Sequence, residues 1–479
     1  MAAFQDLRAY LDELRAKLGG GAVQHVTGAD RDLEIGCLSE LNAQREGPAL
    51  LFDEIPGFPK GFRVLTNYMG TAPACAVALG LEPDAPKLDI VRTWKERSKR
   101  LDPVPYVDVG EGPITENVLE GDDVDLRIFP APHWHREDGG RYIGTADLVI
   151  TRDPDTGWVN VGTYRACVHG KDRLSLWILN NHGRAIAKKY WERGQACPIT
   201  VVVGCEPTLT TAAAMSPPAG VCEFDLAGAL RGKPVEVLYP PGSQLPVPAY
   251  AEIVIEGEMP PPAEESVLEG PFGEWTGYYT HSGQETVVRV TRIMHRNDPI
   301  ILGAPPMIPT ITPGDQAVPL YGACQVWEHL DRSGVDNVRG VWAYGRLLMF
   351  VIAVKQTAPG QARRALETAA TSTHSVGGMQ RYFIVVDDDI DITDINHVLW
   401  AICTRVRPVE SIEIRHSLTT TIDPRIAPDL RAAGDFSMGK VLIDACKPFE
   451  WIGEYPLQNR FDEAYRSEVR ARWGARLQL

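Results

Sequence analysis

The chain has 479 residues, 44% of them hydrophobic and 23% charged, which is the balance of a soluble globular protein with two or three domains. Its formal net charge of -15, from 48 basic and 63 acidic residues, leaves little positive field for nucleic acid or an anionic membrane surface. The expected partner is therefore a small molecule, with no nucleic acid and no membrane.

The first region, residues 1–110, mixes helical patterns with short strands. Apolar runs at 49–52 and 62–67 predict strands. Helical spacing predicts an amphipathic helix that carries Phe4, Leu7, Leu11, Leu14 and Leu18 on one face. Charges interrupt this segment, which therefore lacks the continuous apolar stretch of a signal peptide. Because the nine cysteines are also scattered without a CxxC pair, we expect a cytoplasmic protein.

The second region, residues 111–305, is dominated by strand patterns. Helical patterns are confined to about 184–193 and 208–230. This mixture predicts an antiparallel sheet or barrel with a few helices. The strand patterns are those of residues 146–153, 158–168, 198–204, 251–258, 285–296 and 299–305.

The third region, residues 306–479, alternates apolar strands with helices. Strand patterns at 347–355 and 381–389 are followed by helical patterns at 360–370 and 395–406, which is typical of βαβ units and a parallel sheet. The three acids Asp387–Asp389 offer oxygen ligands for a hard cation, but a polar strand end entering a turn is the simpler explanation.

Polar residues interrupt the strand and helix patterns of the second region. Asn160 and Arg165 lie within a strand pattern, His182 directly precedes a helical pattern, and Glu223 opens another. Together, an amide oxygen, an imidazole and a carboxylate would suit a cation such as Mn²⁺ or Mg²⁺. Taken singly, each residue has an ordinary structural explanation, such as a turn or a favourable charge in a first helical turn. His133 and His135 lack a third ligand nearby, and we favour a loop or packing role for them.

The stretch "VLEGPFGEWTGYY", residues 267–279, sets Glu269 and Glu274 five positions apart across Gly270, Pro271 and Gly273. Acids beside glycine and proline usually mark an exposed turn between strands. The alternative is a pair of carboxylates held together for acid–base chemistry.

The order of these residues resembles the UbiD family of decarboxylases, which use prenylated FMN. The resemblance runs from about residue 110 to the C-terminus, and the spacing of six functional positions makes it specific. It is carried by "NVGTYR" (160–165), "NNHGR" (180–184), "PAGVCEFDLAGAL" (218–230) and "LEGPFGEWTGYY" (268–279), and it extends to "GGRYIGTADLVIT" (139–151), "PITVVVGCEP" (198–207), "RYFIVVDDDID" (381–391) and "VLIDACKP" (441–448).

The resemblance implies an α/β chain, α+β overall, in three domains. These are an N-terminal α/β domain at 1–110, a split β-barrel, flavin-reductase-like cofactor domain at 111–305, and a C-terminal α/β oligomerisation domain with parallel sheet elements at 306–479. It also implies a homodimer or higher homo-oligomer, and a flavin prenyltransferase as supplier of the cofactor.

The same resemblance assigns roles to individual residues. Arg165, Glu269 and Glu274 match the catalytic network, with Glu269 as proton donor. Asn160, His182 and Glu223 match the ligands of a divalent metal, usually Mn²⁺, with K⁺ beside it. The residues expected to bind the cofactor are Asn160, Thr163, Arg165, Asn181, His182, Met215, Glu223 and Arg381, the last standing where the family commonly has lysine. Ile178 and Trp275 are expected near the substrate, with the segments 306–315 and 434–440 closing the other side.

The implied reaction is a reversible, non-oxidative decarboxylation of an aromatic, heteroaromatic or α,β-unsaturated carboxylic acid through a covalent adduct with prenylated FMN. Loss of CO₂ from an sp² carbon needs an electron sink, and the same carbon must then receive a proton from a carboxyl kept protonated by burial. Two acids that share one arginine would titrate as a coupled pair. The acid, the physiological direction, the route to the adduct and the number of subunits stay open.

Two alternatives are a catalytically silent flavin-binding relative and a metal-dependent hydrolase. The first would have lost a member of the Arg165, Glu269 and Glu274 set, and all three are present. The second would want an open metal position with an acid over a bound water. Two further acids and an arginine set apart from the metal ligands instead suit proton transfer to carbon.

Overall fold

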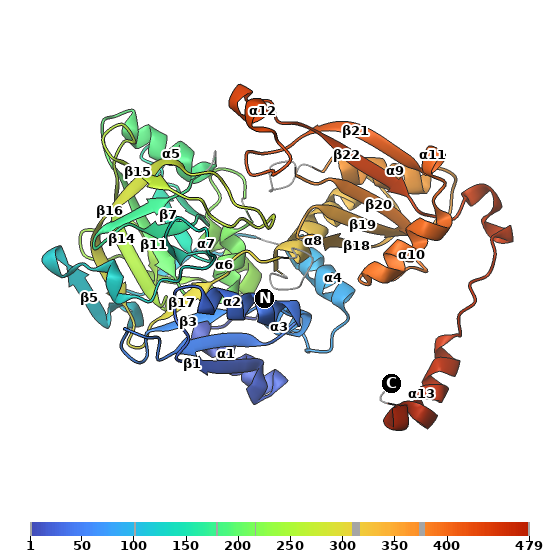
Figure 1. The fold of residues 1–479 in the computed structure, drawn as a ribbon, viewed down its shortest axis with the longest axis horizontal. Coiled ribbons are helices and arrows are strands. Elements are labelled where there is room, and N and C mark those ends of the chain that lie inside the picture. Colours follow the sequence, from blue (N-terminus) through green and yellow to red (C-terminus); the bar gives the residue numbers. More distant parts are fainter. Residues whose placement is uncertain are drawn as a thin grey trace.

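The computed structural model describes residues 2–99, 102–178, 181–215, 217–308, 317–372 and 379–477. Within these residues the strands form four sheets. Figure 1 shows the N-terminal and central regions side by side, with the C-terminal region next to them. No helix of the described residues is long and apolar enough to cross a membrane, and all nine cysteines are free thiols.

The N-terminal region is built on a four-stranded sheet of order β1-β2-β3-β17. The last strand comes from residue 300 onward and pairs in parallel with β3, so the strand predicted at 299–305 belongs to the N-terminal sheet. The predicted amphipathic helix is confirmed as α1, which buries Leu7, Leu11 and Leu14. The elements are α1 Leu7–Leu18, β1 Val23–Thr27, α2 Glu34–Gln44, β2 Ala49–Asp53, β3 Arg63–Thr66, α3 Ala72–Ala78, α4 Lys87–Ser98 and β17 Ile300–Gly303.

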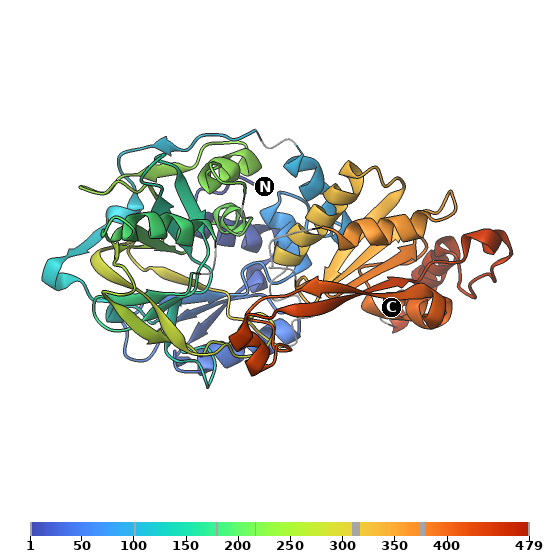
Figure 2. The same cartoon turned by 90° about the horizontal axis from the view of Figure 1, so that it is seen from above.

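The central region is a ten-stranded antiparallel sheet that curls around its own core (Figures 1 and 2). Its inner face buries a cluster of aliphatic side chains that includes Val149, Leu174, Val201 and Ile255, because alternate residues of each strand point inward. The strands are β5 Asn117–Glu120, β6 Arg141–Gly144, β7 Leu148–Arg152, β8 Val159–Gly162, β9 Ala166–Val168, β10 Arg173–Leu176, β11 Cys197–Val203, β14 Ile253–Met259, β15 Ser266–Glu269 and β16 Gly283–His295.

The strand predicted over 158–168 is two strands, β8 and β9, with an irregular link at 163–165. The link carries Arg165 and turns the chain between β8, which pairs with β7, and β9, which pairs with β6. The helical patterns are confirmed as α5 His182–Trp191, α6 Pro207–Ala213 and α7 Glu223–Arg231. A small sheet of β4 Val107–Asp108, β12 Glu236–Leu238 and β13 Val247–Pro248 lies beside them.

The C-terminal region is a five-stranded sheet of order β18-β19-β20-β22-β21. The central pairs β19–β20 and β20–β22 are parallel, as the alternating pattern predicted. The elements are α8 Ala317–Arg332, β18 Val338–Tyr344, β19 Met349–Val354, α9 Gln361–Ala370, β20 Tyr382–Asp387, α10 Ile395–Arg405, α11 Pro408–Ser411, β21 Ile412–Leu418, α12 Pro428–Ala433, β22 Ser437–Asp444 and α13 Glu463–Leu477.

The acids at the end of β20 belong to an ion-pair network. Arg405 binds Asp387 and Asp389 at 2.9 and 3.0 Å, and Lys447 binds Asp389 at 2.6 Å. The simpler explanation of this polar strand end is therefore confirmed. Helix α4 joins the regions, because its Lys95 binds Asp331 of α8 at 2.9 Å and lies 4.0 Å from the Trp327 ring centre.

Taken together, these elements give a mixed α/β chain with a curled central sheet and a C-terminal sheet with parallel strands, which confirms the predicted fold class.

Candidate active site

The turn after β15 holds two buried acids. Glu269 ends the strand, and Gly270 follows at φ 81° with a cis bond to Pro271. The turn is closed by a bond from the Glu274 amide to the Tyr278 carbonyl at 2.9 Å. Glu269 is 2% exposed and Glu274 8%, whereas Tyr278 is 63% exposed. An exposed turn is therefore the wrong explanation for the two acids.

The segment before β6 supports this turn from outside. The buried Asp138 carboxylate accepts hydrogen bonds at 2.9 Å from the amides of His135 and Gly273. The Gly139 amide donates to the Pro271 carbonyl at 2.7 Å, and the His133 ring contacts the Asp138 carbonyl at 3.0 Å. The loop or packing role expected for the two histidines is confirmed, since His133 contacts this segment through its ring and His135 through its backbone amide.

Arg165 binds both acids of the turn. Its Nε and Nη2 donate to Glu269 Oε1 and Oε2 at 2.9 and 2.7 Å, and its Nη1 donates to Glu274 Oε1 at 2.8 Å. The bidentate contact with Glu269 fixes the carboxylate plane as well as its distance. Arg165, Glu269 and Glu274 form one buried cluster, which we call the Arg–Glu network, as the sequence order predicted.

Aromatic side chains enclose the Arg–Glu network. The Arg165 guanidinium carbon lies 4.2 Å from the Trp177 ring centre and 4.9 Å from that of Phe272. The Tyr142 hydroxyl donates to Glu269 Oε1 at 2.7 Å, and its ring lies 4.3 Å from that of Phe272. These rings exclude water, so the charges interact more strongly than at the surface.

Burial and charge act in opposite directions on the ionisable groups of the Arg–Glu network. Burial raises the pKa of Glu274 above its ordinary value, although the charge of Arg165 opposes the shift. Burial alone would lower the pKa of Arg165, but the hydrogen-bonded Glu269 and the charge of Glu274 raise it. The arginine therefore stays charged while Glu274 holds a proton more tightly than a free glutamate.

The residues of the predicted metal site come from β8, α5 and α7. Glu223, at the start of α7, is 3% exposed and accepts a 2.7 Å bond from the Val161 amide, next to Asn160. His182 begins α5, and its ring packs edge-on against Trp158 at 5.1 Å. Burial raises the pKa of Glu223 to about 7. No group of three His, Cys, Asp or Glu side chains that could hold a metal is found in the described parts of the chain. The predicted metal site is not a group of this kind, because its third ligand is the side-chain amide of Asn160.

Two observations fit a polar ligand at this site. The Asn160 amide nitrogen is buried and finds no hydrogen-bond partner of ordinary geometry among the described residues, which is costly unless a ligand completes the site. A Cβ at Gly162 would lie 2.4 Å from the Tyr164 hydroxyl, and a Cβ at Gly183 would lie 2.9 Å from it. The two glycines therefore leave room for this polar hydroxyl beside β8 and α5. The donor set of an amide oxygen, an imidazole and a carboxylate suits Mn²⁺ or Mg²⁺.

The other predicted cofactor residues lie on different elements around β8. Thr163 is exposed on the link between β8 and β9. The Asn181 side chain caps α5 by accepting from the Arg184 amide, and the Met215 carbonyl accepts from the Tyr321 hydroxyl at 2.9 Å. Arg381 belongs to the C-terminal region, where it forms an ion pair with Asp423.

Each predicted substrate residue directly follows a residue that contacts Arg165, namely Trp177 and Glu274. Ile178 follows β10 and is buried in the core of the central sheet. Trp275 follows Glu274, and its ring centre lies 5.4 Å from the guanidinium of Arg346 in the C-terminal region. Residues 434–440 run from the end of α12 into β22. Asn180, Ser216 and 309–316, which fall within predicted motifs, lie outside the described residues.

Sequence reasoning missed Tyr142, Trp177 and Asp147. Tyr142 and Trp177 look like ordinary strand aromatics, and only the fold brings them to Glu269 and Arg165. Asp147 is 1% exposed, and its Oδ2 has no partner among the described residues. Burial raises its pKa to about 8. The sequence signal that could have identified Asp147 is an acid directly before an apolar strand, in "TADLVIT".

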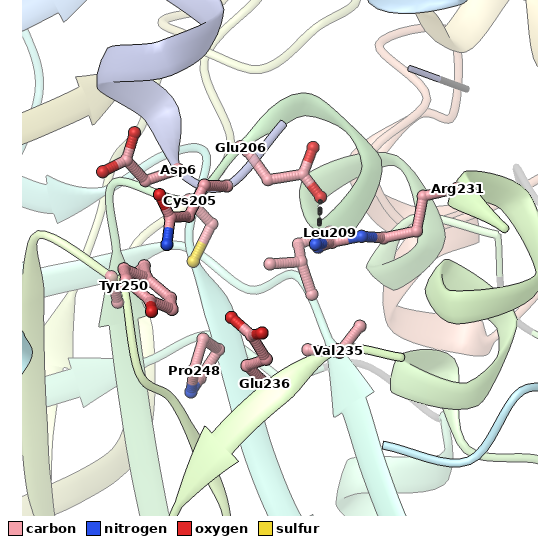
Figure 3. A pocket seen from close by; sticks show the side chains of 11 residues that line it. Asp6, Cys205, Glu206, Leu209, Arg231, Val235, Glu236, Pro248 and Tyr250 are labelled. Carbon is pink, nitrogen blue, oxygen red and sulfur yellow. Dashed lines mark hydrogen bonds and ion pairs between the residues drawn. The ribbon is translucent and has the colours of Figure 1, made fainter. Parts of the chain in front are cut away.

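Figure 3 shows a small cavity next to α6 and α7, lined among others by Cys205, Glu206, Leu209 and Arg231. Glu206, which caps α6, forms a buried ion pair of 3.4 Å with Arg231 in the last turn of α7. Met215 follows the C-terminal end of α6, and Glu223 begins α7. The pair therefore fixes these helices at one end and the predicted ligands lie at the other.

Comparisons with known proteins cover nearly the whole chain. Family models of the UbiD type match three stretches: the 3-octaprenyl-4-hydroxybenzoate carboxy-lyase N-terminal domain at 19–94, the Rift-related domain at 106–309 and the C-terminal domain at 320–445. A phenolic acid decarboxylase of Bacillus subtilis (strain 168) is 33% identical over 459 residues, which are 93% of each chain. A pyrrole-2-carboxylic acid decarboxylase of Pseudomonas aeruginosa is 30% identical over 98% of this chain and 97% of its own.

Solved structures agree with these matches. The UbiD-class enzyme HmfF from Pelotomaculum thermopropionicum, in complex with FMN, superposes with a TM-score of 0.84 at 28% identity, over 96% of this chain and 98% of its own. An evolved dimeric form of that enzyme, in complex with prFMN, superposes with a TM-score of 0.81 over the same shares of the two chains, at 27% identity.

Proposed function

The chain belongs to the UbiD family of carboxy-lyases, and on that premise we propose that it decarboxylates an aromatic, heteroaromatic or α,β-unsaturated carboxylic acid, reversibly and without oxidation, with Glu269 as proton donor. The observation that carries the proposal is the Arg–Glu network, in which one arginine binds two buried acids at 2.7–2.9 Å. A silent relative would have no use for this costly arrangement, because burying a charged pair rarely stabilises a fold.

Prenylated FMN is the cofactor proposed for this site, as in the HmfF complex with prFMN. When bound, it supplies the electron sink that loss of CO₂ from an sp² carbon requires. The residues that would hold it are Asn160, Thr163, Arg165, Asn181, His182, Met215, Glu223 and Arg381. Asn160, His182 and Glu223 would bind Mn²⁺ or a similar divalent metal, and K⁺ would be a second ion of the site.

The residues of the Arg–Glu network have distinct roles in this proposal. Arg165 orients both acids and stays charged throughout. Glu269 delivers a proton to the carbon that has lost CO₂, and Glu274, whose pKa burial raises, returns a proton to Glu269. The aromatic wall of Trp177 and Phe272 keeps water away from the reacting carbon.

The substrate class follows from the relatives and the lining of the site. The curated relatives are named for phenolic acids and pyrrole-2-carboxylic acid, and flat acids of this size are our first candidates. Ile178 and Trp275 are proposed to contact the ring, where a flat aromatic side chain favours a flat substrate.

The rest of the chain is proposed to support this activity. Residues 1–110 and 111–305 would form the N-terminal and cofactor domains, and 306–479 the domain through which copies of the chain assemble as a homodimer or larger homo-oligomer. A flavin prenyltransferase would supply the cofactor. We place the enzyme in the cytoplasm, since nine unpaired thiols suit a reducing compartment.

The test is a screen of carboxylic acids with protein purified from a host that co-expresses a flavin prenyltransferase. We expect flavin-like absorbance and CO₂ release from at least one aromatic or α,β-unsaturated acid, and the reverse reaction in concentrated bicarbonate. Glu269→Gln should lose at least a hundredfold in rate, because general acid catalysis contributes about that much or more. The exposed Glu264→Gln is the control and should match the parent. Failure to bind any FMN derivative, or full activity of Glu269→Gln, would refute the proposal.

A further inference from the structure

Tyr142 makes a contact with Glu269 that the Arg–Glu network does not include. Its hydroxyl donates to Glu269 Oε1 at 2.7 Å between two fully buried side chains. The tyrosine is held on three sides: its amide donates to the Pro132 carbonyl at 3.0 Å, its carbonyl accepts from the Trp134 indole, and its ring packs on Phe272. The donor is therefore fixed before any substrate arrives.

The two oxygens of Glu269 differ in how many donors they meet. Oε1 accepts from Arg165 Nε at 2.9 Å and from Tyr142 at 2.7 Å, whereas among the residues that the structure describes Oε2 accepts only from Arg165 Nη2 at 2.7 Å. A carboxylate oxygen has two lone-pair positions. Both positions of Oε1 are filled, and Oε2 keeps one that can carry a proton.

We infer that Tyr142 is a positioning residue that, by occupying Oε1, restricts the transferable proton of Glu269 to Oε2. This inference rests on the proposed function, because it concerns the proton that Glu269 delivers. Tyr142 does not touch the reacting carbon and acts only through Glu269.

The proton transfer balances without any further reactant. The O–H bond at Glu269 Oε2 breaks, and the electron pair left at the carbon by the departing CO₂ forms the new C–H bond. Glu269 is left ionised, with its charge facing Arg165 and with Tyr142 still donating to Oε1. The next proton reaches Oε2 from Glu274, and Oε1 never needs to change partners.

A tyrosine suits this position because it is a neutral donor. Burial and the neighbouring Glu269 raise the pKa of Tyr142 well above its ordinary value, so the hydroxyl keeps its proton and cannot itself become the acid. Other groups whose charges reach Glu269 are Arg165, Cys167, His169 and Glu285. Among the described residues, the hydrogen bonds to the Glu269 carboxylate come from Arg165 and Tyr142.

The first test does not need a substrate. Infrared spectra of the holoenzyme are titrated with pH, and the carboxyl band of Glu269 is identified by its loss in Glu269→Gln. Tyr142→Phe removes one hydrogen bond to an ionised carboxylate, which should move the titration of this band upward by about one to two pH units. Tyr10→Phe is the matched control, since Tyr10 is equally buried and its hydroxyl donates to backbone carbonyls of the N-terminal region. An unshifted band in Tyr142→Phe would overturn the inference.

The second test uses the acid that releases most CO₂ in the screen. Tyr142→Phe should lower kcat about tenfold, slow deuterium incorporation at the product carbon to the same extent, and leave KM nearly unchanged, because the contact matters at proton transfer and not at binding. Tyr10→Phe should leave all three unchanged. A purely structural tyrosine would instead lower the melting temperature without shifting the pH profile. If the parent releases CO₂ from no acid, the proposed function fails, and the infrared titration alone decides the role of Tyr142.

Discussion

Asp147 is the buried acid that the proposed chemistry does not use. It precedes β7, and a Cβ on Gly144 would lie 2.6 Å from its carboxyl carbon and from its Oδ2. Its surroundings provide no basic partner among the described residues, and burial raises its pKa to about 8. At neutral pH the folded chain therefore holds this side chain mostly as the neutral acid.

A pH dependence of stability follows from this raised pKa. In the unfolded chain the Asp147 pKa returns to about 3.9, so between pH 4 and 8 the unfolded state loses the proton while the folded state keeps it. Stability then falls as pH rises through this window, by up to about 5 kcal/mol for four pKa units, and levels off above pH 8. Asp147→Asn is neutral at every pH, and its stability should lose this slope. Urea unfolding at pH 5 and pH 8.5 measures the difference.

The control for this prediction is the exposed Asp84→Asn, which should keep the slope of the parent. Other groups titrate equally in all three proteins, so the difference between the two asparagine variants isolates Asp147. Parallel stability curves for the parent and Asp147→Asn would contradict the prediction.

At the residue scale, the sequence predicted the charged side chains of the Arg–Glu network and missed Tyr142, the aromatic side chain that positions Glu269. Glu269, Glu274 and Arg165 could be predicted because their order and spacing resemble those of the UbiD family, whereas acids beside glycine and proline alone favoured an exposed turn. Tyr142 could not, because an aromatic residue in a strand is the expected core residue. Its role depends on β6 and β15 bringing it to Glu269, which no local pattern encodes.

At the element scale, the support of the catalytic turn depends on a close backbone approach at Gly139. A Cβ at this position would lie 2.1 Å from the Gly270 carbonyl oxygen and 2.5 Å from its carbon. These are backbone atoms, so relief of the clash must move the turn that carries Glu269 and Glu274. Glycine is required here by space and not by its φ angle.

Gly139→Ala should therefore reduce activity more than stability. We expect a loss of about 1–3 kcal/mol in unfolding free energy, as for overpacking in a core. We also expect at least a tenfold loss of CO₂ release, because a shift of a fraction of an ångström misplaces the proton donor. Gly21→Ala is the control, since its Cβ would meet nothing within 4 Å and its φ is not positive. Parent-like activity in Gly139→Ala would show that the turn can move without cost.

Elements with strong periodicity could be predicted, and the pairing between distant elements could not. The α1 helix and strands such as β2, β11 and β14 follow from apolar spacing alone. The break between β8 and β9 was missed because its residues read as one continuous strand. The addition of β17 to the N-terminal sheet depends on β3, more than 230 residues earlier, and local sequence carries no information on such pairing.

At the scale of the whole molecule, the C-terminal segment stands apart from the rest of the chain. Figure 1 shows α13 well separated from the C-terminal sheet. The hydrogen bonds and ion pairs found for the described residues 459–477 lie within the segment itself. Several large side chains from Leu457 onward are exposed, at 97% for Leu457 and 69% for Phe461, and the others are Tyr465, Trp473 and Leu477.

A helix of this length is marginal in water by itself, and exposed aromatic side chains of this number are typical of an interaction surface. We therefore expect the segment to pack on a second copy of the chain. Removing residues 459–479 should leave the four sheets and the active site intact but lower the mass of the assembly, measured by light scattering after size exclusion. The melting temperature should then depend on protein concentration in the full chain more than in the truncated one, since assembly stabilises by mass action.

A second variant separates the apolar contact from chain length. Phe461→Ser combined with Trp473→Ser keeps all 479 residues and removes two exposed aromatic side chains. If these side chains bind a neighbouring copy, the variant should assemble as poorly as the truncated chain, because aromatic anchors carry much of the energy of an interface. Arg472→Ala, an exposed change on the same helix, should assemble like the parent. An unchanged mass for the truncated chain would place the interface elsewhere, with the exposed edge strand β21 as the next surface to test.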